Sequence, residues 1–594
     1  MLGEIENLVK RYMAIRYATS GRYSEFDGAI YYLSDLTGEQ VLWRAYREPQ
    51  GYRYDLVLPW DRRINSYRIS PAGYIAFSTD VDGDEHWSIY IARGDSIKLA
   101  SGENGSINNL GEWSPSGRFL SYSSNARNGV DFDLYVYDLI SGRSIMILQN
   151  DGMINPSRWI DDNLLLAVKM NTYQDTDLML VRRDDGGSIN LTRHSGESLN
   201  TNPIAIDDRF LIFITNQDRE FTGIAIYDLE KRVWKYIVTE EWDIEKIDYR
   251  DGRIAYVVNE GGASTIKIYT LEDKRSREAV RIWGVVDDID LYSGGMVLSI
   301  NSPKHGQEVF ILNDMGVLER VTYSPRIGVS EESFVSPEMF RYRSFDGLEI
   351  HGLLYRPRKP VGDKPPAVIY LHGGPESQER VVFNRVQQAL LSLGIAIVSP
   401  NYRGSSGYGK TFIHLDDVDK RMGTVYDVYH AIENLSGRGY IDPTRLCVMG
   451  ASYGGYLTLM MLTQYPDLWR CGVEIVGIVN LITFIRNTGA WRRKYRITEY
   501  GDPEIHGDIM MKLSPISYID RIKAPLMVIH GARDPRVPVS EAEQLVNALR
   551  NKSIEVRYIR LEDEGHGISK VRNRVRVYSE AIRFIYEKIV SSSA

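Results

Sequence analysis

The stretch that decides the fold of this chain is Arg445-Leu-Cys-Val-Met-Gly-Ala-Ser-Tyr-Gly-Gly-Tyr-Leu-Thr-Leu-Met-Met, residues 445–461. It predicts an apolar strand, a tight turn centred on Ser452 and an apolar helix. The small residues beside Ser452 allow a strained turn that holds the serine hydroxyl out at the end of the strand. A Gly-x-Ser-x-Gly motif also arises by chance at ordinary strand-to-helix turns, so the rest of the sequence must decide what this one means.

Two later segments supply the partners that a reactive serine needs. A serine hydroxyl is a weak nucleophile until a base takes its proton, and the base in turn needs an orienting acid. Asp534 comes just after an apolar strand, and His566 follows another strand between two glycines. The chain order Ser, Asp, His is typical of the α/β-hydrolase fold. The sequence therefore predicts a catalytic triad of Ser452, Asp534 and His566.

Other acidic and histidine residues compete for these roles. Asp502, Asp520 and Asp563 also follow the serine, but none comes directly after a predicted buried strand. His530 ends a strand pattern and is interpreted as a packed structural histidine, whereas His506 lies in a polar stretch and is interpreted as a surface residue.

The reaction also needs hydrogen-bond donors for a developing oxyanion. The strand Val368-Ile-Tyr-Leu ends in His372-Gly-Gly-Pro, which is similar to the glycine-rich oxyanion loops of esterases. We expect the backbone N–H groups of Gly374 and Tyr453 to be these donors. The alternative is a plain Gly-Gly-Pro turn. The next loop, residues 401–410, is interpreted as a structural support beside it.

The region before residue 336 has a different pattern, with short strands rich in Tyr, Ile, Val and Leu between polar turns. Turn signals recur at a spacing of roughly 42–46 residues, the period of a four-stranded propeller blade. Seven such units predict a seven-bladed β-propeller, and a pair of β-sandwiches is the alternative. The turn signals are Asp27-Gly28, Pro71-Ala-Gly73, Pro115-Ser-Gly117, Asp161-Asp-Asn163, Asp207-Asp208, Asp251-Gly252 and Ser293-Gly-Gly295.

A chain of 594 residues is too long for one hydrophobic core, since single cores stop growing at roughly 250–300 residues. We expect an N-terminal helix within residues 1–19, the propeller at residues 20–335, and the α/β-hydrolase domain at residues 336–594. The last region alternates apolar strands with helical patterns, which favours a mostly parallel sheet flanked by helices.

Composition narrows the partners and the location. Hydrophobic residues make up 43% of the chain, and 71 basic against 79 acidic residues give a net charge of −8, which does not favour nucleic acid or anionic lipid. The acidic start has no signal-peptide pattern and no apolar run is long enough to span a bilayer, so we expect a cytoplasmic protein without a membrane partner. The two cysteines, Cys447 and Cys471, are interpreted as core residues, and no metal or cofactor is expected.

Five motifs together carry a family resemblance. They are His372-Gly-Gly-Pro, Asn401-Tyr-Arg-Gly-Ser, Gly450-Ala-Ser-Tyr-Gly-Gly, His530-Gly-Ala-Arg-Asp-Pro-Arg-Val-Pro and Asp563-Glu-Gly-His-Gly. In combination they resemble the prolyl oligopeptidase family of serine peptidases, specifically its acylaminoacyl-peptidase branch. The resemblance implies a propeller that caps the hydrolase domain, an N-terminal helix that returns to that domain, and cleavage of short peptides with release of N-acylated amino acids.

Other functions remain open at this stage. A dipeptidyl aminopeptidase would share the scaffold, although no clear glutamate pair for a free amine is found in the propeller region. A carboxylesterase would share the triad. From a different class, a propeller-based binding protein could carry an inactive hydrolase domain. A homo-oligomer is compatible with the sequence but nothing in it specifies one.

Overall fold

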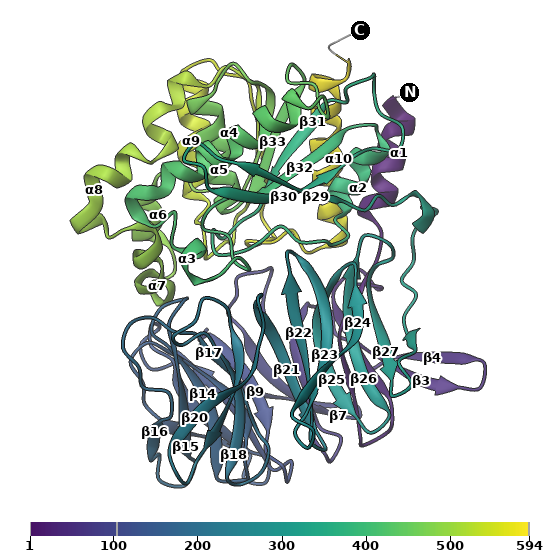
Figure 1. Ribbon diagram of the computed structural model, residues 1–594, viewed down its shortest axis with the longest axis vertical. Helices are drawn as coiled ribbons and strands as arrows, with labels where there is room; N and C mark the ends of the chain where they lie inside the picture. The colour runs from purple at the N-terminus through teal and green to yellow at the C-terminus, as the bar shows by residue number, and fades with distance from the viewer. Residues whose placement is uncertain (1, 103–104, 592–594) are drawn as a thin grey trace.

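The computed structural model describes residues 2–102 and 105–591, which form two stacked units (Figure 1). One unit is a ring of β-sheets and the other is a sheet covered by helices on both faces. The strands of the ring run from Ala18 to Arg320, and the second unit's sheet begins at Glu338. The first strand thus starts two residues before the predicted domain start at residue 20.

The ring consists of seven four-stranded antiparallel sheets, each made of four consecutive strands. This confirms the seven-bladed propeller and excludes the pair of β-sandwiches. The strands are β1 to β4 (Ala18–Tyr23, Ile30–Ser34, Val41–Glu48, Gly51–Leu56), β5 to β8 (Ile64–Ile69, Ile75–Thr79, Ser88–Arg93, Ser96–Ser101), β9 to β12 (Asn108–Trp113, Phe119–Ser124, Asp133–Asp138, Arg143–Leu148), β13 to β16 (Met153–Trp159, Leu164–Met170, Thr176–Arg182, Ser188–Asn190), β17 to β20 (Asn200–Ala205, Phe210–Thr215, Gly223–Asp228, Val233–Thr239), β21 to β24 (Ile244–Arg250, Arg253–Glu260, Ala263–Thr270, Arg275–Ile282) and β25 to β28 (Val285–Tyr292, Gly295–Ser302, Gly306–Asn313, Leu318–Arg320).

The seven turn signals found in the sequence fall at equivalent places in the ring. Each lies at the connection between the first and second strand of its sheet, for example Asp27-Gly28 between β1 and β2. The blade repeat could be detected in the sequence because each blade has a similar polar turn before its buried second strand.

Apolar contacts between neighbouring blades hold the ring together. Alternate side chains of each twisted sheet pack against the next sheet, and the first blade meets the last in the same way, with Ala18 and Ile30 packed among Val297 and Val309. The closure also has a polar part, because the backbone N–H of Gly21 donates to Ser299 Oγ at 2.8 Å. Side-chain packing and hydrogen bonds therefore close the ring without an exchanged strand.

The second unit is built on an eight-stranded sheet in the order β29-β30-β32-β31-β33-β34-β35-β36, parallel from β32 to β36. The strands are β29 (Glu338–Arg343), β30 (Glu349–Tyr355), β31 (Ala367–Leu371), β32 (Ala396–Asn401), β33 (Leu446–Ala451), β34 (Trp469–Ile475), β35 (Leu526–Gly531) and β36 (Val556–Leu561). The α-helices are α1 (Leu2–Met13), α2 (Arg385–Ser392), α3 (Lys410–Ile413), α4 (Met422–Gly437), α5 (Tyr453–Gln464), α6 (Leu481–Asn487), α7 (Ala490–Tyr500), α8 (Pro503–Lys512), α9 (Ser540–Asn551) and α10 (Val571–Ile589). Short 3₁₀ segments are η1 (Glu331–Ser333), η2 (Val418–Arg421) and η3 (Pro515–Arg521).

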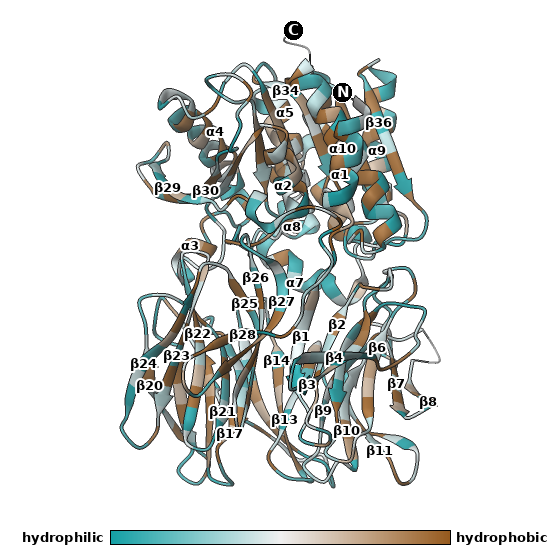
Figure 2. Ribbon diagram, turned by 90° about the vertical axis from the view of Figure 1, so that its right-hand side faces the viewer, coloured by the Kyte–Doolittle hydropathy of each residue, from teal (hydrophilic) through white to brown (hydrophobic). Residues whose placement is uncertain are grey.

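Helices cover both faces of this sheet, whose apolar strands are sandwiched between them (Figure 2). Helices α4, α5 and α9 pack on one face, and α1, α2 and α10 on the other. Helix α1 docks through Val9, Tyr12 and Met13, and Arg574 Nε of α10 donates to the Met13 carbonyl at 2.9 Å. The N-terminal helix therefore returns to the second unit, as the family resemblance implied.

The chain order of the strands reverses beside β31, which has β32 on one side and β33 on the other. In open α/β sheets, such a switch point opens a crevice at the carboxyl ends of the strands, where ligands bind. Those ends face the propeller: the loop after β32 contacts it through a hydrogen bond from the Lys410 N–H to the Glu220 carbonyl at 2.9 Å. The fold thus places the crevice between the two units.

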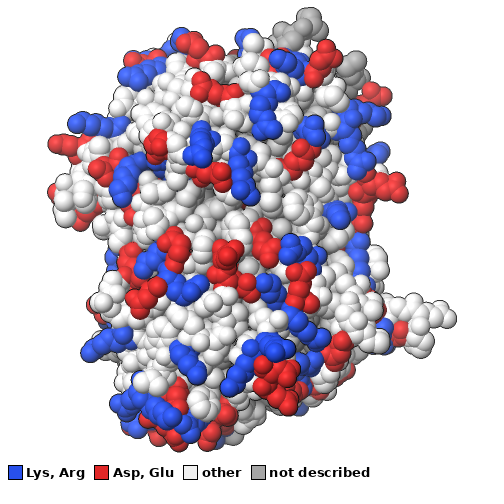
Figure 3. All heavy atoms as spheres, in the orientation of Figure 1, with Lys and Arg blue, Asp and Glu red and all other residues white. Residues whose placement is uncertain are grey.

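Cys447 and Cys471 face each other in register on β33 and β34, and both are free and buried, as predicted. Within the described ranges, no helix is both long and apolar enough to cross a membrane. On the face of the molecule in Figure 3, basic and acidic side chains are interspersed.

Candidate active site

Ser452 occupies the turn that the sequence predicted, between β33 and α5. Its backbone has φ 59° and ψ −118°, which a non-glycine residue adopts only where the surroundings enforce it. The flanking glycines explain how: a Cβ on Gly450 would overlap the Gly454 carbonyl, and one on Gly454 would overlap the Leu371 carbonyl. The neighbouring strand and helix thus fix a strained serine at the sheet edge.

Asp534 and His566 form a hydrogen-bonded pair at the same edge. His566 Nδ1 lies 2.7 Å from Asp534 Oδ2, and the other carboxylate oxygen accepts backbone N–H groups from Arg536 at 2.8 Å and Val537 at 3.0 Å. Burial alone would raise the pKa of Asp534, but the positive charge and hydrogen bond of His566 hold that pKa below its usual value. The carboxylate is therefore an ionised group aimed at the imidazole.

The structure brings two of the three predicted triad members into direct contact. Ser452 follows β33, Asp534 follows β35 and His566 follows β36, and these strands lie in that order with only β34 between the first two. Among the described residues, Ser452 Oγ makes no hydrogen bond with His566. The complete triad therefore remains a prediction.

The competing residues lie where the sequence suggested. His530 is fully buried, and its Nε2 lies 2.8 Å from the Val537 carbonyl, which confirms a packed structural histidine. His506 Nδ1 accepts the Asp502 backbone N–H at 3.0 Å at the start of α8. Asp563 pairs with Lys570 at 3.0 Å. His530 Nε2 also lies 3.6 Å from Asp534 Oδ2, but only His566 is within hydrogen-bond distance of that oxygen.

The predicted oxyanion loop packs directly on the nucleophile. A Cβ on Gly373 would lie 3.3 Å from Ser452 Cβ, and Gly374 has φ +127°, a conformation that favours glycine. Tyr453 is the first residue of α5, and the first N–H groups of a helix have no partner within it. Gly373 thus lies against Ser452, with Gly374 next to it in the loop and Tyr453 next to Ser452 in the chain, and the action of Gly374 and Tyr453 as donors remains a prediction.

The loop after β32 supports this region, as predicted. Tyr402 OH donates to the His372 carbonyl at 2.6 Å, and the two rings stack with centroids 4.3 Å apart. Burial lowers the pKa of His372 to about 4, so the imidazole is neutral at physiological pH. A neutral His372 adds no charge beside the oxyanion loop and acts as packing.

A propeller loop between β6 and β7 contacts the loops that carry the acid and the base. Asp82 pairs with Lys570 at 2.5 Å, four residues after His566, and Glu85 pairs with Arg536 at 2.6 Å, two residues after Asp534. Sequence reasoning missed both acidic residues. No local pattern marks them, because their partners lie more than four hundred residues away.

A cavity of about 440 Å³ lies between the two units. Asp243 and Asp287 of the propeller line it and form no ion pair within the described residues, and burial raises the pKa of Asp287 to about 6. From the hydrolase side Arg380 lines it, and its guanidinium pairs with Glu245 at 2.8 Å. Arg380 follows Gly374 by six residues in the chain, but the described residues that line the cavity do not include Ser452, Asp534 or His566.

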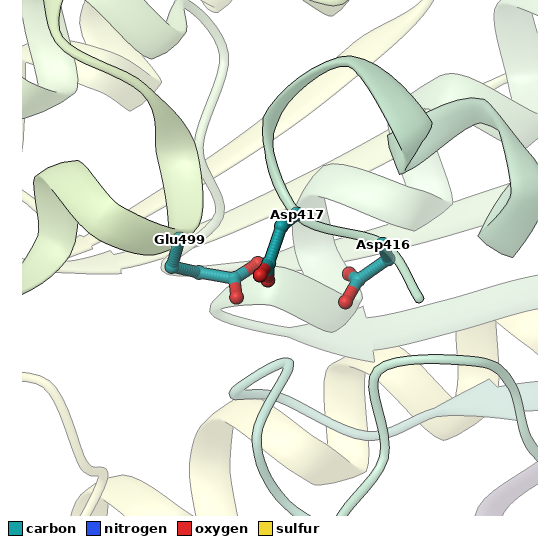
Figure 4. Close-up of side chains that lie close together, drawn as sticks. All are labelled: Asp416, Asp417 and Glu499. Atoms are coloured by element: carbon teal, nitrogen blue, oxygen red, sulfur yellow. The ribbon is translucent and has the colours of Figure 1, made fainter. Parts of the chain in front are cut away.

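Three carboxylates, those of Asp416, Asp417 and Glu499, lie within 4.8 Å of one another (Figure 4). Their spacing would suit a metal ion, but side-chain cations already pair with them. Arg421 lies 2.9 Å from Glu499 and 3.6 Å from Asp416, and His414 lies 2.8 Å from Asp417. Hydrogen bonds to two carboxylates raise the pKa of His414 to about 10. We therefore assign no metal to this cluster.

Residues 381–592 match the model of the prolyl oligopeptidase family. The second unit is therefore similar to this family over most of its length. The matched range includes Ser452, Asp534 and His566, and it confirms the resemblance drawn from the five motifs.

Curated proteins also match part of this chain. The chain is 31% identical over 276 residues to Dipeptidyl peptidase family member 6 of Caenorhabditis elegans, covering 42% of this chain and 37% of that protein. It is 28% identical over 251 residues to the human acylamino-acid-releasing enzyme, covering 41% and 34%. The chain thus spans little more than a third of the length of these curated relatives.

A solved structure extends the likeness over both units. A puromycin-hydrolyzing peptidase from Mycobacterium tuberculosis superposes with a TM-score of 0.86 at 19% identity, covering 98% of this chain and 96% of that one. At this identity the match establishes the shared fold of both units.

Proposed function

We propose that the chain is a serine peptidase that hydrolyses short peptides through an acyl-enzyme. Ser452 attacks the scissile carbonyl, His566 takes the serine proton and delivers it to the leaving amine, and Asp534 holds the required tautomer of His566. The N–H groups of Gly374 and Tyr453 stabilise the oxyanion. In the second step His566 takes a proton from water, the water attacks the acyl-enzyme, and His566 returns the proton to Ser452.

The observation that carries this proposal is the Asp534–His566 pair at the same sheet edge as a strained, glycine-flanked serine. The Asp534 carboxylate is held by backbone N–H groups from Arg536 and Val537 on one oxygen, and its other oxygen fixes the orientation of the His566 ring. In the absence of substrate, catalytic hydrogen bonds are often long and tighten in the complex. We expect the bond from Ser452 to His566 to form in this way.

We propose N-acylated peptides as substrates, with release of the N-acylated amino acid. The acylamino-acid-releasing relative supports this class. The propeller covers the crevice, and the cavity of about 440 Å³ is far smaller than a folded domain, which supports the exclusion of folded proteins. Short peptides are then the partners, and neither nucleic acid nor membrane takes part. We also propose a cytoplasmic location and a division of the chain near residues 19 and 335.

A second candidate is a dipeptidyl aminopeptidase. Asp243 and Asp287 in the cavity carry carboxyl groups without an ion-pair partner among the described residues, which would suit a free peptide amine. The relative named as a dipeptidyl peptidase points the same way. A carboxylesterase would use the same triad with less recognition of the amine side.

A substrate panel that varies only the N-terminus tests these alternatives. Acetyl-alanine and free-amine dialanine would each be offered as chromogenic anilides, and short-chain acids as chromogenic esters. Faster turnover of the acetylated substrate supports the proposal, and faster turnover of the free-amine substrate favours the dipeptidyl enzyme. Turnover of esters alone contradicts the peptidase assignment.

A further inference from the structure

A buried arginine lies behind both predicted oxyanion donors. The Arg421 guanidinium carbon lies 5.3 Å from the ring centre of Tyr453 and 4.6 Å from that of Tyr500, so it contacts both rings. Its charge is balanced by Glu499 at 2.9 Å and Asp416 at 3.6 Å. Arg421 has no exposed surface and Tyr500 is 2% exposed. This cluster is part of the protein interior and has no direct access to substrate.

Each of the two rings ends in a hydroxyl that is tied to a different part of the site. Tyr453 OH donates to Asp416 Oδ2 at 3.0 Å, which fixes the side chain of the residue whose backbone N–H is one predicted donor. Tyr500 OH donates to the Gly374 carbonyl at 2.9 Å, which holds the residue that carries the other donor. The two donors therefore share one support, although they lie on different loops.

Gly374 needs such a tether more than most residues. Its φ of +127° lies in a region open mainly to glycine, and glycine has the largest choice of alternative backbone conformations. A hydrogen bond from a buried hydroxyl to its carbonyl removes much of that choice. Since oxyanion donors act at 2.7–3.1 Å from the developing charge, a small displacement of Gly374 weakens transition-state stabilisation.

We infer that Tyr500 is a positioning residue for the oxyanion hole, and that Arg421 couples it to Tyr453. The inference rests on the proposed roles of Gly374 and Tyr453. Tyr500 stabilises the transition state through Gly374, and it leaves substrate binding in the ground state largely unaffected. Removing the Tyr500 hydroxyl should therefore lower kcat and leave KM nearly unchanged.

Tyr456 provides a matched control from the same cluster. Its ring stacks on Tyr453 with centroids 5.2 Å apart, it is fully buried, and its OH donates to the Leu513 carbonyl at 2.9 Å. The bond has the same chemistry and length as that of Tyr500. Leu513 ends α8 and belongs to no loop of the site.

The experiment compares the full-length Tyr500→Phe and Tyr456→Phe variants. We expect Tyr500→Phe to lower kcat about tenfold with KM within twofold, since outright removal of one oxyanion donor lowers kcat by roughly 10²–10³. Tyr456→Phe should keep kcat within twofold. A peptide aldehyde, which forms a tetrahedral adduct, should bind Tyr500→Phe about tenfold more weakly, whereas the product-like N-acyl amino acid should bind both variants equally.

Melting curves establish that each variant is folded, and both variants are assayed at a temperature below their melting points. Equal kcat for Tyr500→Phe and Tyr456→Phe overturns the inference, as does unchanged affinity for the aldehyde. A loss that appears in KM alone also overturns it. Loss of activity in Ser452→Ala together with a normal Tyr500→Phe refutes this inference only, whereas retained activity in Ser452→Ala refutes the proposed function.

Discussion

Gly83 of the propeller and Gly565, the residue before His566, pack backbone against backbone. A Cβ on Gly83 would lie 2.7 Å from the Gly565 nitrogen, and a Cβ on Gly565 would overlap the Gly83 carbonyl. Side chains are thus excluded on both sides of the contact. Together with the ion pairs from Asp82 and Glu85, this contact makes the position of His566 depend on how the propeller is seated.

Gly83→Ala should therefore lower catalysis from outside the hydrolase domain. The added methyl group meets the Gly565 backbone, which cannot move without shifting His566. We expect kcat to fall at least tenfold, because proton transfer requires hydrogen-bond geometry between the base and the serine. Steady-state kinetics on an acetylated peptide measure this effect.

Gly129→Ala is the control for backbone strain alone. Gly129 has φ +76° against +78° for Gly83, and a Cβ there meets no atom within 4 Å. Both variants should lose about 1–2 kcal/mol of folding stability through the left-handed conformation. Equal activities for the two variants would show that the propeller contact does not position the base.

Asp534→Asn should reduce kcat by roughly 10³–10⁴, because an amide favours the wrong tautomer of the paired histidine. Asp563→Asn serves as the comparison, since Asp563 also precedes His566 closely but pairs with Lys570 and Arg572 near the surface. We expect its kcat within threefold of the parent enzyme. A larger loss in Asp563→Asn than in Asp534→Asn would reassign the acid of the triad.

Glu474→Gln should make the free energy of unfolding less sensitive to a rise in pH. Burial raises the pKa of Glu474 on β34 to about 8, far above its ordinary value of 4.5. Between those pH values the folded chain keeps a proton that the unfolded chain releases, so stability is full below about pH 4.5 and declines as the pH rises to 8. The decline contributes about 1.4 kcal/mol per pH unit.

Denaturant unfolding at pH 5 and pH 8.5 measures this contribution. Glutamine has no proton to lose, so the variant should gain stability relative to the parent as the pH rises. Glu562→Gln, at a side chain that is 72% exposed, should follow the parent at both pH values. If the difference in unfolding free energy between Glu474→Gln and the parent is the same at both pH values, titration of Glu474 does not cause the decline.

The sequence predicted those parts of the molecule that are written in local patterns. Ser452 could be placed because its flanking glycines are required by backbone contacts within one strand–turn–helix unit, and the propeller because every blade repeats its turn. The contact of Gly83 with Gly565 could not be predicted, since it joins irregular loops almost five hundred residues apart. The hydrogen bond from Tyr500 to Gly374 could not be predicted either, because a bond between a tyrosine hydroxyl and a distant carbonyl produces no pattern in the sequence.

The most direct test of the central claim is a measurement on Ser452→Ala. Parent and variant would be treated with a fluorophosphonate probe, which labels activated serines, and assayed on the acetylated peptide. The account predicts labelling of the parent at Ser452, no labelling of the variant, and peptide hydrolysis reduced at least a thousandfold. Unchanged hydrolysis by a folded Ser452→Ala protein would contradict it.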